Sequence, residues 1–148
     1  MDIARENLTE KFVKELTPLV VDHANELEIH GGAVASVNWE IYHQLNVAGL
    51  LWVFSARGPD GSMEGYASYV IEPSPHCEGI YTAYQDAFYV IPQARGHFVG
   101  PQLLQYAEKK LKPLVHAIRQ SIPIQNDFSP MLVRKGYELT ELVYEKRL

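Results

Sequence analysis

The 148-residue sequence has a single cysteine, no long apolar run and no excess of basic residues. One cysteine, Cys77, excludes an internal disulfide, and no Cys and His spacing matches a structural zinc site, so we expect no metal. The net charge of -5 argues against a protein held on nucleic acid by a basic surface. No apolar run reaches the about 18 residues of a membrane span, and residues 1–12 lack the layout of a signal peptide. We therefore expect a cytoplasmic protein that binds neither nucleic acid nor membrane.

The sequence also lacks internal repeats, low-complexity tracts and linkers long enough to separate domains. Its hydrophobic fraction of 47% over 148 residues is enough for one well-packed core and hardly enough for two. We expect a single domain over residues 1–148.

The first third of the sequence predicts two helices. Thr9 is a plausible N-cap, and apolar residues then recur at spacings of three and four, up to Leu27. Pro18 falls inside this pattern and predicts a kink or a break near Thr17. A second, shorter helix is expected between a cap at Asn38 and a stop at Gly49, with Trp39, Tyr42 and Leu45 on one side.

The remainder of the sequence predicts alternating strands and helices. Residues 50–57 and 63–72 flank a turn rich in Gly, Pro and Asp and should form a hairpin. The further expected elements are a strand over 80–91, a helix over 99–112, a strand over 114–123, a helix over 127–135 and a closing strand over 136–148. The order βααβββαβαβ indicates an α+β (mixed α/β) fold built around one sheet.

The junction between the strand over 80–91 and the next helix has the features of an anion site. The segment "DAFYVIPQARGHFVG", residues 86–100, leads an apolar strand through Arg95, Gly96 and Gly100 into a helix. A helix that begins in this way presents free backbone N–H groups and the positive end of its dipole. The alternative interpretation is an ordinary strand-to-helix turn with a surface arginine. Neither a P-loop nor a dinucleotide fingerprint fits the spacing of the glycines.

This segment, followed by "LLQYAE", resembles the acetyl-coenzyme A (acetyl-CoA) motif of the GCN5-related N-acetyltransferase (GNAT) family. The later "NDFSPMLVRKGYEL", which begins at Asn126, resembles the second motif of that family. The order of elements also resembles that family along nearly the whole chain, which implies a mostly antiparallel, twisted central sheet flanked by helices. The segments "PLVVDHANEL" and "VYEKRL" look most like small bacteriophage-encoded members, which would place the protein in the host cytoplasm.

The resemblance implies where acetyl-CoA would bind. The diphosphate would lie on backbone N–H groups in the loop that runs through Arg95, Gly96, His97, Phe98, Val99 and Gly100. Phe98 stands where the family has its first motif glycine, so the loop must accommodate a side chain there. The pantetheine arm would pair with the preceding strand at Phe88, Tyr89 and Val90, and Asn126 belongs to the second motif.

The chemistry of acetyl transfer to an amine needs a base and an acid. Asp86 is the candidate base, and simple strand alternation would place it on one face with Phe88 and Val90. The alternative is that Asp86 orients a neighbour or binds the substrate ammonium. Many family members carry a tyrosine that acts as the general acid, and Leu132 stands at that position in this sequence. Tyr137 and Tyr144 are nearby in sequence, but tyrosines in strands more often serve packing.

The acceptor side of the site is less defined by sequence. His23 and Glu26 lie one helical turn apart and could border the acceptor cleft, or His23 could pack while Glu26 is solvated. His76 lies in a loop that leads toward the strand of Asp86 and could line the acceptor pocket. The loops around residues 28–38 and 72–80 would set acceptor identity, while Trp39 and Tyr42 are expected in the core.

Two functions fit the sequence. The first is an acetyl-CoA-dependent N-acetyltransferase that acts on a primary amine of a small molecule or a protein by direct attack in a ternary complex. The second is a catalytically weak or inactive GNAT-fold protein that binds and regulates a partner protein, which Phe98 and Leu132 favour. A homodimer is compatible with either function.

Overall fold

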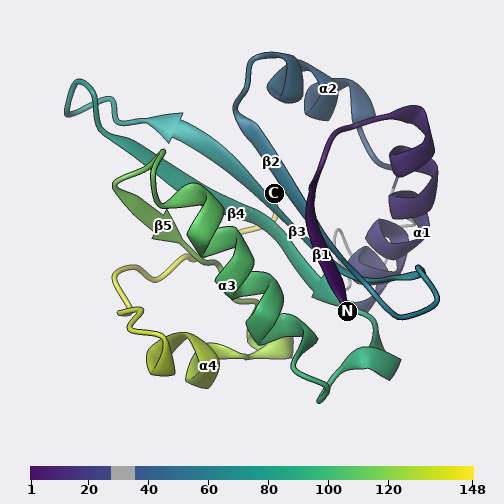
Figure 1. Ribbon diagram of the computed structural model, residues 1–148. Helices are drawn as coiled ribbons and strands as arrows, with labels where there is room; N and C mark the ends of the chain where they lie inside the picture. The colour runs from purple at the N-terminus through teal and green to yellow at the C-terminus, as the bar shows by residue number, and fades with distance from the viewer. Residues whose placement is uncertain (28–35) are drawn as a thin grey trace.

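The computed structural model describes residues 1–27 and 36–148 and shows one five-stranded sheet between two layers of helices (Figure 1). Most of the loop over 28–38, which was expected to shape the acceptor site, lies outside the described residues. The helices and strands are β1 (Asp2–Glu6), α1 (Glu10–Glu26), α2 (Trp39–Val47), β2 (Leu51–Arg57), β3 (Met63–Pro73), β4 (Tyr81–Val90), α3 (Val99–Leu111), β5 (Ala117–Arg119) and α4 (Ser129–Arg134). Short 3₁₀ turns occupy Pro92–Ala94 and Ile124–Asn126.

The strands lie in the order β1-β2-β3-β4-β5, and all neighbours are antiparallel except β4 and β5. This arrangement confirms the α+β fold class and the predicted hairpin of β2 and β3. No helix in the described parts of the chain has both the length and the apolar run needed to cross a membrane.

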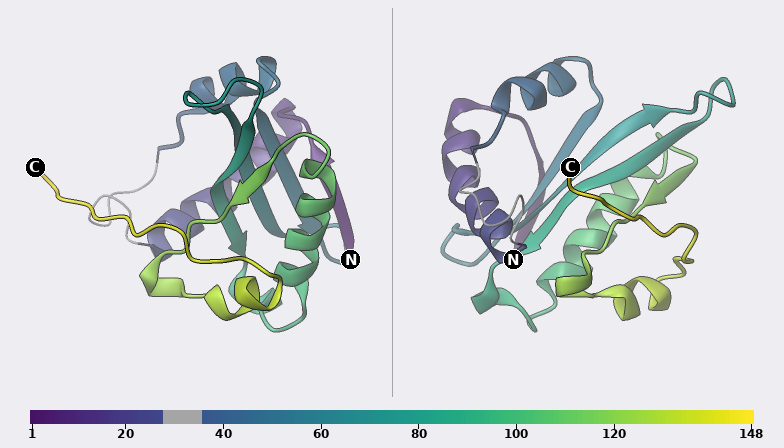
Figure 2. Two further views of the ribbon diagram at one scale, coloured as in Figure 1. Left: turned by 90° about the vertical axis from the view of Figure 1, so that its left-hand side faces the viewer. Right: turned by 180° about the vertical axis from the view of Figure 1, so that it is seen from behind.

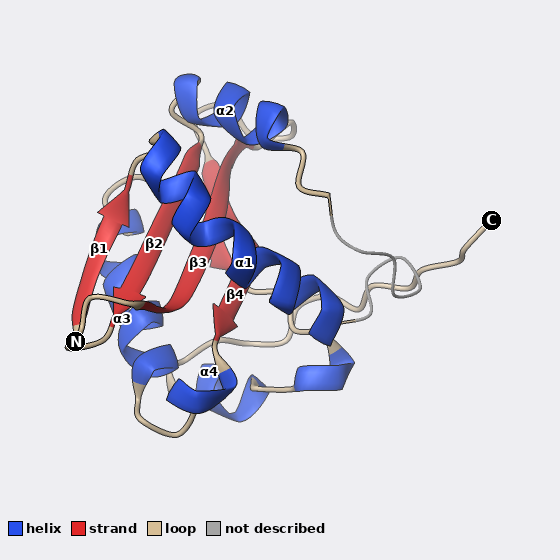
Figure 3. Cartoon of the chain, turned by 90° about the vertical axis from the view of Figure 1, so that its right-hand side faces the viewer, coloured by secondary structure: helices blue, strands red, loops and turns tan. Residues whose placement is uncertain are grey.

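Each face of the sheet carries its own apolar cluster. Phe54, Ala67 and Tyr69 are buried against the inner side of α3, which contributes Leu103 and Leu111. The opposite face packs against α1, where Phe12 and Leu16 meet strand residues that include Val53, Tyr66 and Tyr89. Figures 2 and 3 show α1 lying across one face of the sheet and α3 across the other.

The helix ends follow local sequence rules. The Thr9 side chain accepts a hydrogen bond from the Phe12 N–H at 3.1 Å, and Asn38 caps α2 in the same way. Gly49 and Gly136 follow α2 and α4 with positive φ angles of 75° and 88°. Of the kink or break expected near Thr17, the break is wrong, because α1 continues through Pro18 to Glu26, while the kink stays a prediction. Pro18 removes one backbone hydrogen bond and crowds the carbonyl four residues earlier, and the packing of α1 on the sheet offsets this cost.

The end of the chain differs most from the sequence-based expectation. The strand expected over 114–123 is only Ala117–Arg119, because Leu114 and Val115 still hydrogen-bond back to the Leu111 carbonyl. The closing strand expected over 136–148 is absent from this described segment, which forms no ladder with the sheet. Several large apolar side chains on it are exposed, among them Leu139, Leu142, Val143 and Tyr144. The predicted homodimer stays a prediction.

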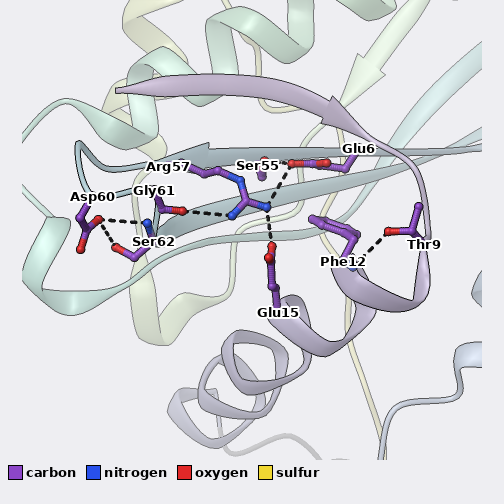
Figure 4. A network of polar contacts seen from close by, with 9 residues as sticks. All are labelled: Glu6, Thr9, Phe12, Glu15, Ser55, Arg57, Asp60, Gly61 and Ser62. Carbon is purple, nitrogen blue, oxygen red and sulfur yellow. Dashed lines mark hydrogen bonds and ion pairs between the residues drawn. The ribbon is translucent and has the colours of Figure 1, made fainter.

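An ion-pair network fixes α1 to the edge of the sheet (Figure 4). Arg57 of β2 donates from Nη2 to Glu15 Oε2 of α1 at 2.6 Å, and the same nitrogen lies 3.5 Å from Glu6 Oε1 of β1. Its Nη1 donates to the Gly61 carbonyl at 3.2 Å. The hydrogen bond from Arg57 lowers the pKa of Glu15, so both groups are charged at neutral pH.

Candidate functional site

A β-bulge in β4 is the starting point of the candidate site. Ser68 of β3 pairs with Ala87, but the next residue, Tyr69, pairs with Gln85, so Asp86 is the extra residue of the ladder. A bulge of this kind bends the strand and redirects its side chains. The position of Asp86 in the sheet therefore differs from that of a regular strand residue.

The bulge places Asp86 on the α1 side of the sheet. Asp86 and Ala87 both line a cavity on that side, whereas Phe88 and Val90 pack in the cluster beneath α3. The prediction that Asp86 shares a face with Phe88 and Val90 is therefore wrong. Simple alternation fails here because one inserted residue shifts the phase of the strand.

The cavity has a volume of about 230 Å³ and lies between α1, α2 and the central strands. Asp86 accepts two hydrogen bonds there, both at Oδ2: one from the Tyr42 hydroxyl and one from Ser68 Oγ, each at 2.8 Å. Within the described residues no other side chain donates to this carboxylate, so Oδ1 has no side-chain donor among them. A carboxylate held at one oxygen can accept a charge-assisted hydrogen bond from an ammonium group at the other.

Tyr42 was expected to be a core residue, and the structure gives it a polar role as well. Burial, and then the negative charge of Asp86, raise the pKa of the Tyr42 hydroxyl far above its ordinary value. The hydroxyl therefore keeps its proton and remains a hydrogen-bond donor to Asp86. It fixes the carboxylate from the α2 side, while Ser68 fixes it from within the sheet.

His23 packs against aromatic rings, as one of its two interpretations expected, and it also lines the cavity, while its role toward an acceptor stays a prediction. Its ring stacks on Tyr89 with centroids 4.9 Å apart, and Nδ1 lies 3.0 Å from the Tyr66 hydroxyl. Burial lowers the pKa of His23, which keeps the imidazole neutral near pH 7. A neutral His23 adds a hydrogen-bonding group to the cavity without adding charge.

Glu26 links the helical side of the site to the loop before α3. Its Oε2 lies 2.6 Å from Arg95 Nη2, and its Oε1 accepts a hydrogen bond from Asn126 Nδ2 at 3.3 Å. The expectation of a simply solvated Glu26 is therefore wrong. Arg95 also donates from Nε to the Val90 carbonyl at 2.9 Å. These contacts join α1, the end of β4 and the turn at Ile124–Asn126.

The loop from Arg95 to Gly100 has the free donors of an anion cradle. In the described parts of the chain, no protein acceptor is bound by the N–H groups of Gly96, Phe98, Val99 and Gly100, while the His97 N–H donates to the Ala94 carbonyl at 3.4 Å. These free donors stand at the start of the thirteen-residue α3, where the helix dipole is positive. The loop therefore fits a diphosphate.

Phe98 adopts a backbone conformation that favours glycine. Its φ of 61° and ψ of 11° lie in the left-handed region, and its side chain is 70% exposed. An L-residue pays about 1–2 kcal/mol for this conformation. The loop therefore contains local strain at Phe98.

Among the described residues, no strand pairs with the second half of β4 on the edge that faces β5. β5 pairs with β4 only at Thr82, Ala83 and Tyr84. The Ile91 N–H donates to the Glu64 carbonyl of β3, so strand alternation turns the backbone groups of Phe88 and Val90 toward this edge. The Val90 carbonyl accepts from Arg95 Nε, and an extended ligand can pair with the remaining groups as an additional strand.

Four residues considered at the sequence level, His76, Leu132, Tyr137 and Tyr144, do not line the cavity. His76 lies in the exposed loop that precedes Tyr81. The strand from Tyr81 to Asp86 alone is about 17 Å long. Leu132 is 6% exposed in α4, and Tyr137 lies in a second hollow beside Lys135. Neither hydroxyl-bearing candidate, Tyr137 or Tyr144, lines the cavity. Among the described residues no three His, Cys, Asp or Glu side chains gather to hold a metal ion.

Sequence reasoning missed Tyr42 and Ser68 as partners of Asp86. The only available signal for Ser68 was a small polar residue inside the apolar run "GYASYVI", where it is 5% exposed. A buried serine needs a hydrogen-bond partner, which here is the carboxylate. For Tyr42 no local signal separated a hydroxyl that binds a carboxylate from one that faces solvent.

Comparison with known proteins gives structural likeness but no sequence match. No family model and no curated protein matches the chain. A ribosomal-protein-alanine N-acetyltransferase from Brucella melitensis biovar Abortus 2308 has a TM-score of 0.75 at 19% identity, with all of both chains covered. An aminoglycoside N-acetyltransferase in complex with CoA has a TM-score of 0.68 at 21% identity, covering 99% of this chain and 100% of that one.

A transcriptional regulator from Bacillus halodurans C-125 has a TM-score of 0.78 at 14% identity, covering 99% of this chain and 100% of that one. These likenesses concern the fold, which is shared by proteins of more than one described role. The narrower likeness to bacteriophage-encoded proteins stays a prediction. The chain thus has the fold of the GNAT acetyltransferases.

Proposed function

We propose that the protein is an acetyl-CoA-dependent N-acetyltransferase that acts on a primary amine by direct attack in a ternary complex. The observation that carries this proposal is the position of Asp86. The bulge directs its carboxylate into a cavity, while the strand that bears it has an open edge and leads into the anion cradle. An acceptor amine and an acyl donor would therefore meet on the same strand.

The residues present fit acetyl-CoA as the co-substrate. The free N–H groups of Gly96, Phe98, Val99 and Gly100 would hold the diphosphate, and the open edge at Phe88 and Val90 would hold the pantetheine arm. Arg95 and His97 lie in the same loop. The Arg95 guanidinium lies over the ring of Tyr89, and Asn126 is linked to Arg95 through Glu26, which contacts both. When bound, acetyl-CoA supplies the thioester carbonyl that the amine attacks.

The remaining chemistry belongs to residues of the chain. Asp86 Oδ1 accepts a proton from the acceptor ammonium, directly or through a water molecule, and leaves the amine nucleophilic. Tyr42 and Ser68 hold the carboxylate in place at Oδ2. Backbone N–H groups at Phe88 or Val90 stabilise the oxyanion of the tetrahedral intermediate. As the tetrahedral intermediate collapses, the attached nitrogen gives up its second proton to solvent. The thiolate departs and takes a proton from solvent, since a thiol has a pKa of about 8.5.

The alternative function is that of a catalytically weak protein that regulates a partner protein. Leu132, buried in hydrocarbon surroundings, supplies no acid at the position where the family usually has a tyrosine. A positioned acid contributes about 10² to 10⁴ in rate, so its absence lowers activity without abolishing it. The two functions are distinguished by turnover, because both allow acetyl-CoA to bind.

The decisive experiment compares Asp86→Asn with the wild-type protein for thiol release from acetyl-CoA in the presence of primary amines. Asp22→Asn is the matched control, because Asp22 is an exposed aspartate on α1 that does not line the cavity. We expect Asp86→Asn to lose about 10² to 10⁴ in kcat while its Kd for CoA is unchanged. Equal turnover in both variants would remove Asp86 as the base. CoA binding without turnover in the wild-type protein would favour the regulatory function.

A further inference from the structure

We propose that the acceptor is a compact amine with a single ammonium group on an apolar or aromatic body, and that the cavity beneath α1 binds that body. This inference rests on the proposed acetyl transfer and adds the class of the acceptor. Polycationic amines, such as polyamines and aminoglycosides, are disfavoured by the same site.

The composition of the cavity wall carries the first step. Apart from the polar group around Asp86 and the paired side chains of His23 and Tyr66, the described lining residues are mainly hydrocarbon, and include Leu16, Val20, Leu27, Val37, Trp39 and Val53. This hydrocarbon part of the wall offers few hydrogen-bond partners to a hydroxylated or highly charged ligand. It favours a ligand whose body is itself apolar, because burial of that body is the main source of affinity.

The charge of the cavity carries the second step. Asp86 is the only carboxylate among the described residues that line it, and His23 is neutral near pH 7 because burial lowers its pKa. Glu26 and Arg95 lie nearby but neutralise each other at 2.6 Å. One ammonium can therefore be paired with Asp86 Oδ1. A second ammonium drawn into the cavity would find no carboxylate among the described lining residues and would retain its desolvation penalty.

The size of the cavity carries the third step. Its volume of about 230 Å³ is below the roughly 300 Å³ at which pockets for drug-sized ligands begin. The polar end formed by Tyr42, Ser68 and Asp86 leads to the apolar wall of α1 without an intervening charge among the described residues. A ligand with a short amine arm and one ring or branched chain fits this shape.

The test measures kcat/KM for 2-phenylethylamine, methylamine, spermidine and kanamycin. We expect 2-phenylethylamine to exceed spermidine and kanamycin by about tenfold or more. Val20→Phe fills the cavity wall and should lower kcat/KM for 2-phenylethylamine about tenfold, mainly through KM, while methylamine is unaffected. Val21→Phe is the matched control, since its neighbour Val21 on α1 does not line the cavity. Preferred use of spermidine or kanamycin would overturn the inference, as would an unaltered KM in Val20→Phe.

A binding measurement separates this inference from the proposed function. 2-Phenylethylamine is titrated into the protein without acetyl-CoA, and backbone amide shifts are followed by NMR. Saturable shifts at Ser68 and Ala87 that are lost in Val20→Phe would support the cavity inference, even if no acetyl transfer occurred. Absence of such shifts, together with turnover of polycationic amines, would overturn the inference and leave the acetyltransferase function standing.

Discussion

Arg95 Nη2 lies 2.6 Å from Glu26 Oε2, so the arginine of the loop before α3 is bound to α1. Both side chains are partly exposed, which keeps the net contribution of this ion pair to stability small. A bound diphosphate would compete with the Glu26 carboxylate for the same guanidinium. Under the proposed function, the affinity for CoA should therefore depend on both residues.

The first prediction concerns this competition. Arg95→Gln should weaken CoA binding about tenfold or more, because it removes a charge-assisted hydrogen-bond donor. Glu26→Gln should strengthen binding severalfold, because Arg95 then has no competing anion. Isothermal titration calorimetry measures both Kd values, and Lys110→Gln on the outer side of α3 controls for the loss of one positive charge. Unaltered binding in Arg95→Gln would contradict a role for Arg95 at the phosphates.

The second prediction concerns the left-handed backbone of Phe98. Phe98→Gly should be more stable than Phe98→Ala by about 1 kcal/mol, because only glycine adopts a φ of 61° without steric cost. Urea unfolding of the two variants measures the difference, and the alanine variant accounts for the loss of the aromatic ring. Equal stabilities would show that the loop relaxes out of this conformation.

The third prediction separates the two glycines of the cradle. A Cβ at Gly100 would meet Phe88 and Val90 at ordinary contact distances of 3.8 and 3.9 Å, so Gly100→Ala should leave the fold intact. It should nevertheless weaken CoA binding if the backbone lies against the diphosphate. Gly96→Ala, at a φ of +84°, should be destabilising by about 1 kcal/mol. Thermal unfolding measures the stability of the two variants, and calorimetry measures their Kd for CoA. An undiminished CoA affinity in Gly100→Ala would argue against close contact between the Gly100 backbone and the diphosphate.

The fourth prediction concerns the acid sensitivity of the network around Arg57. The pKa of Glu15 is lowered in the folded state, chiefly by the hydrogen bond from Arg57. Its contribution to stability is therefore present above the unfolded pKa and is lost as the pH falls through the folded pKa. Glu15→Gln should have a lower Tm than the wild type near pH 7, and the difference should vanish in acid. Glu10→Gln, at an exposed pair with Lys14, should show little of this trend.

The fifth prediction concerns the exposed apolar residues near the carboxyl end. If the homodimer forms through them, the double variant Leu142→Ser, Val143→Ser should shift the mass measured by light scattering from dimer to monomer. Ile124→Ser, which also alters an exposed apolar side chain, should leave the mass unchanged. A monomeric wild-type protein at high concentration would end the dimer hypothesis.

Much of the fold could be predicted because its elements have strong local patterns. The spacing of apolar residues from Phe12 and from Val99 defines α1 and α3, and turn residues define the hairpin of β2 and β3. The final strand was wrongly predicted, because apolar and branched residues after Gly136 favour an extended chain without determining whether it pairs.

The candidate site was predictable only in part. The cradle is continuous in sequence, and so its residues could be named from one motif. Asp86 instead depends on Tyr42, 44 residues away, and Arg95 depends on Glu26, 69 residues away. Such contacts arise from the packing of α1 and α2 on the sheet and have no local signature.

The bulge in β4 has a consequence for redesign of the site. The bulge is a feature of the backbone, so we expect the side chain at position 86 to point toward the cavity whichever residue is placed there. We expect Tyr89 to keep its contact with the ring of His23 in such variants. Deletion of Asp86 would leave Gln85 and Ala87 in regular alternation and Tyr89 on its present face, so the sheet itself does not need the extra residue. The extra residue serves the cavity instead, because it supplies the carboxylate that accepts from the Tyr42 and Ser68 hydroxyls.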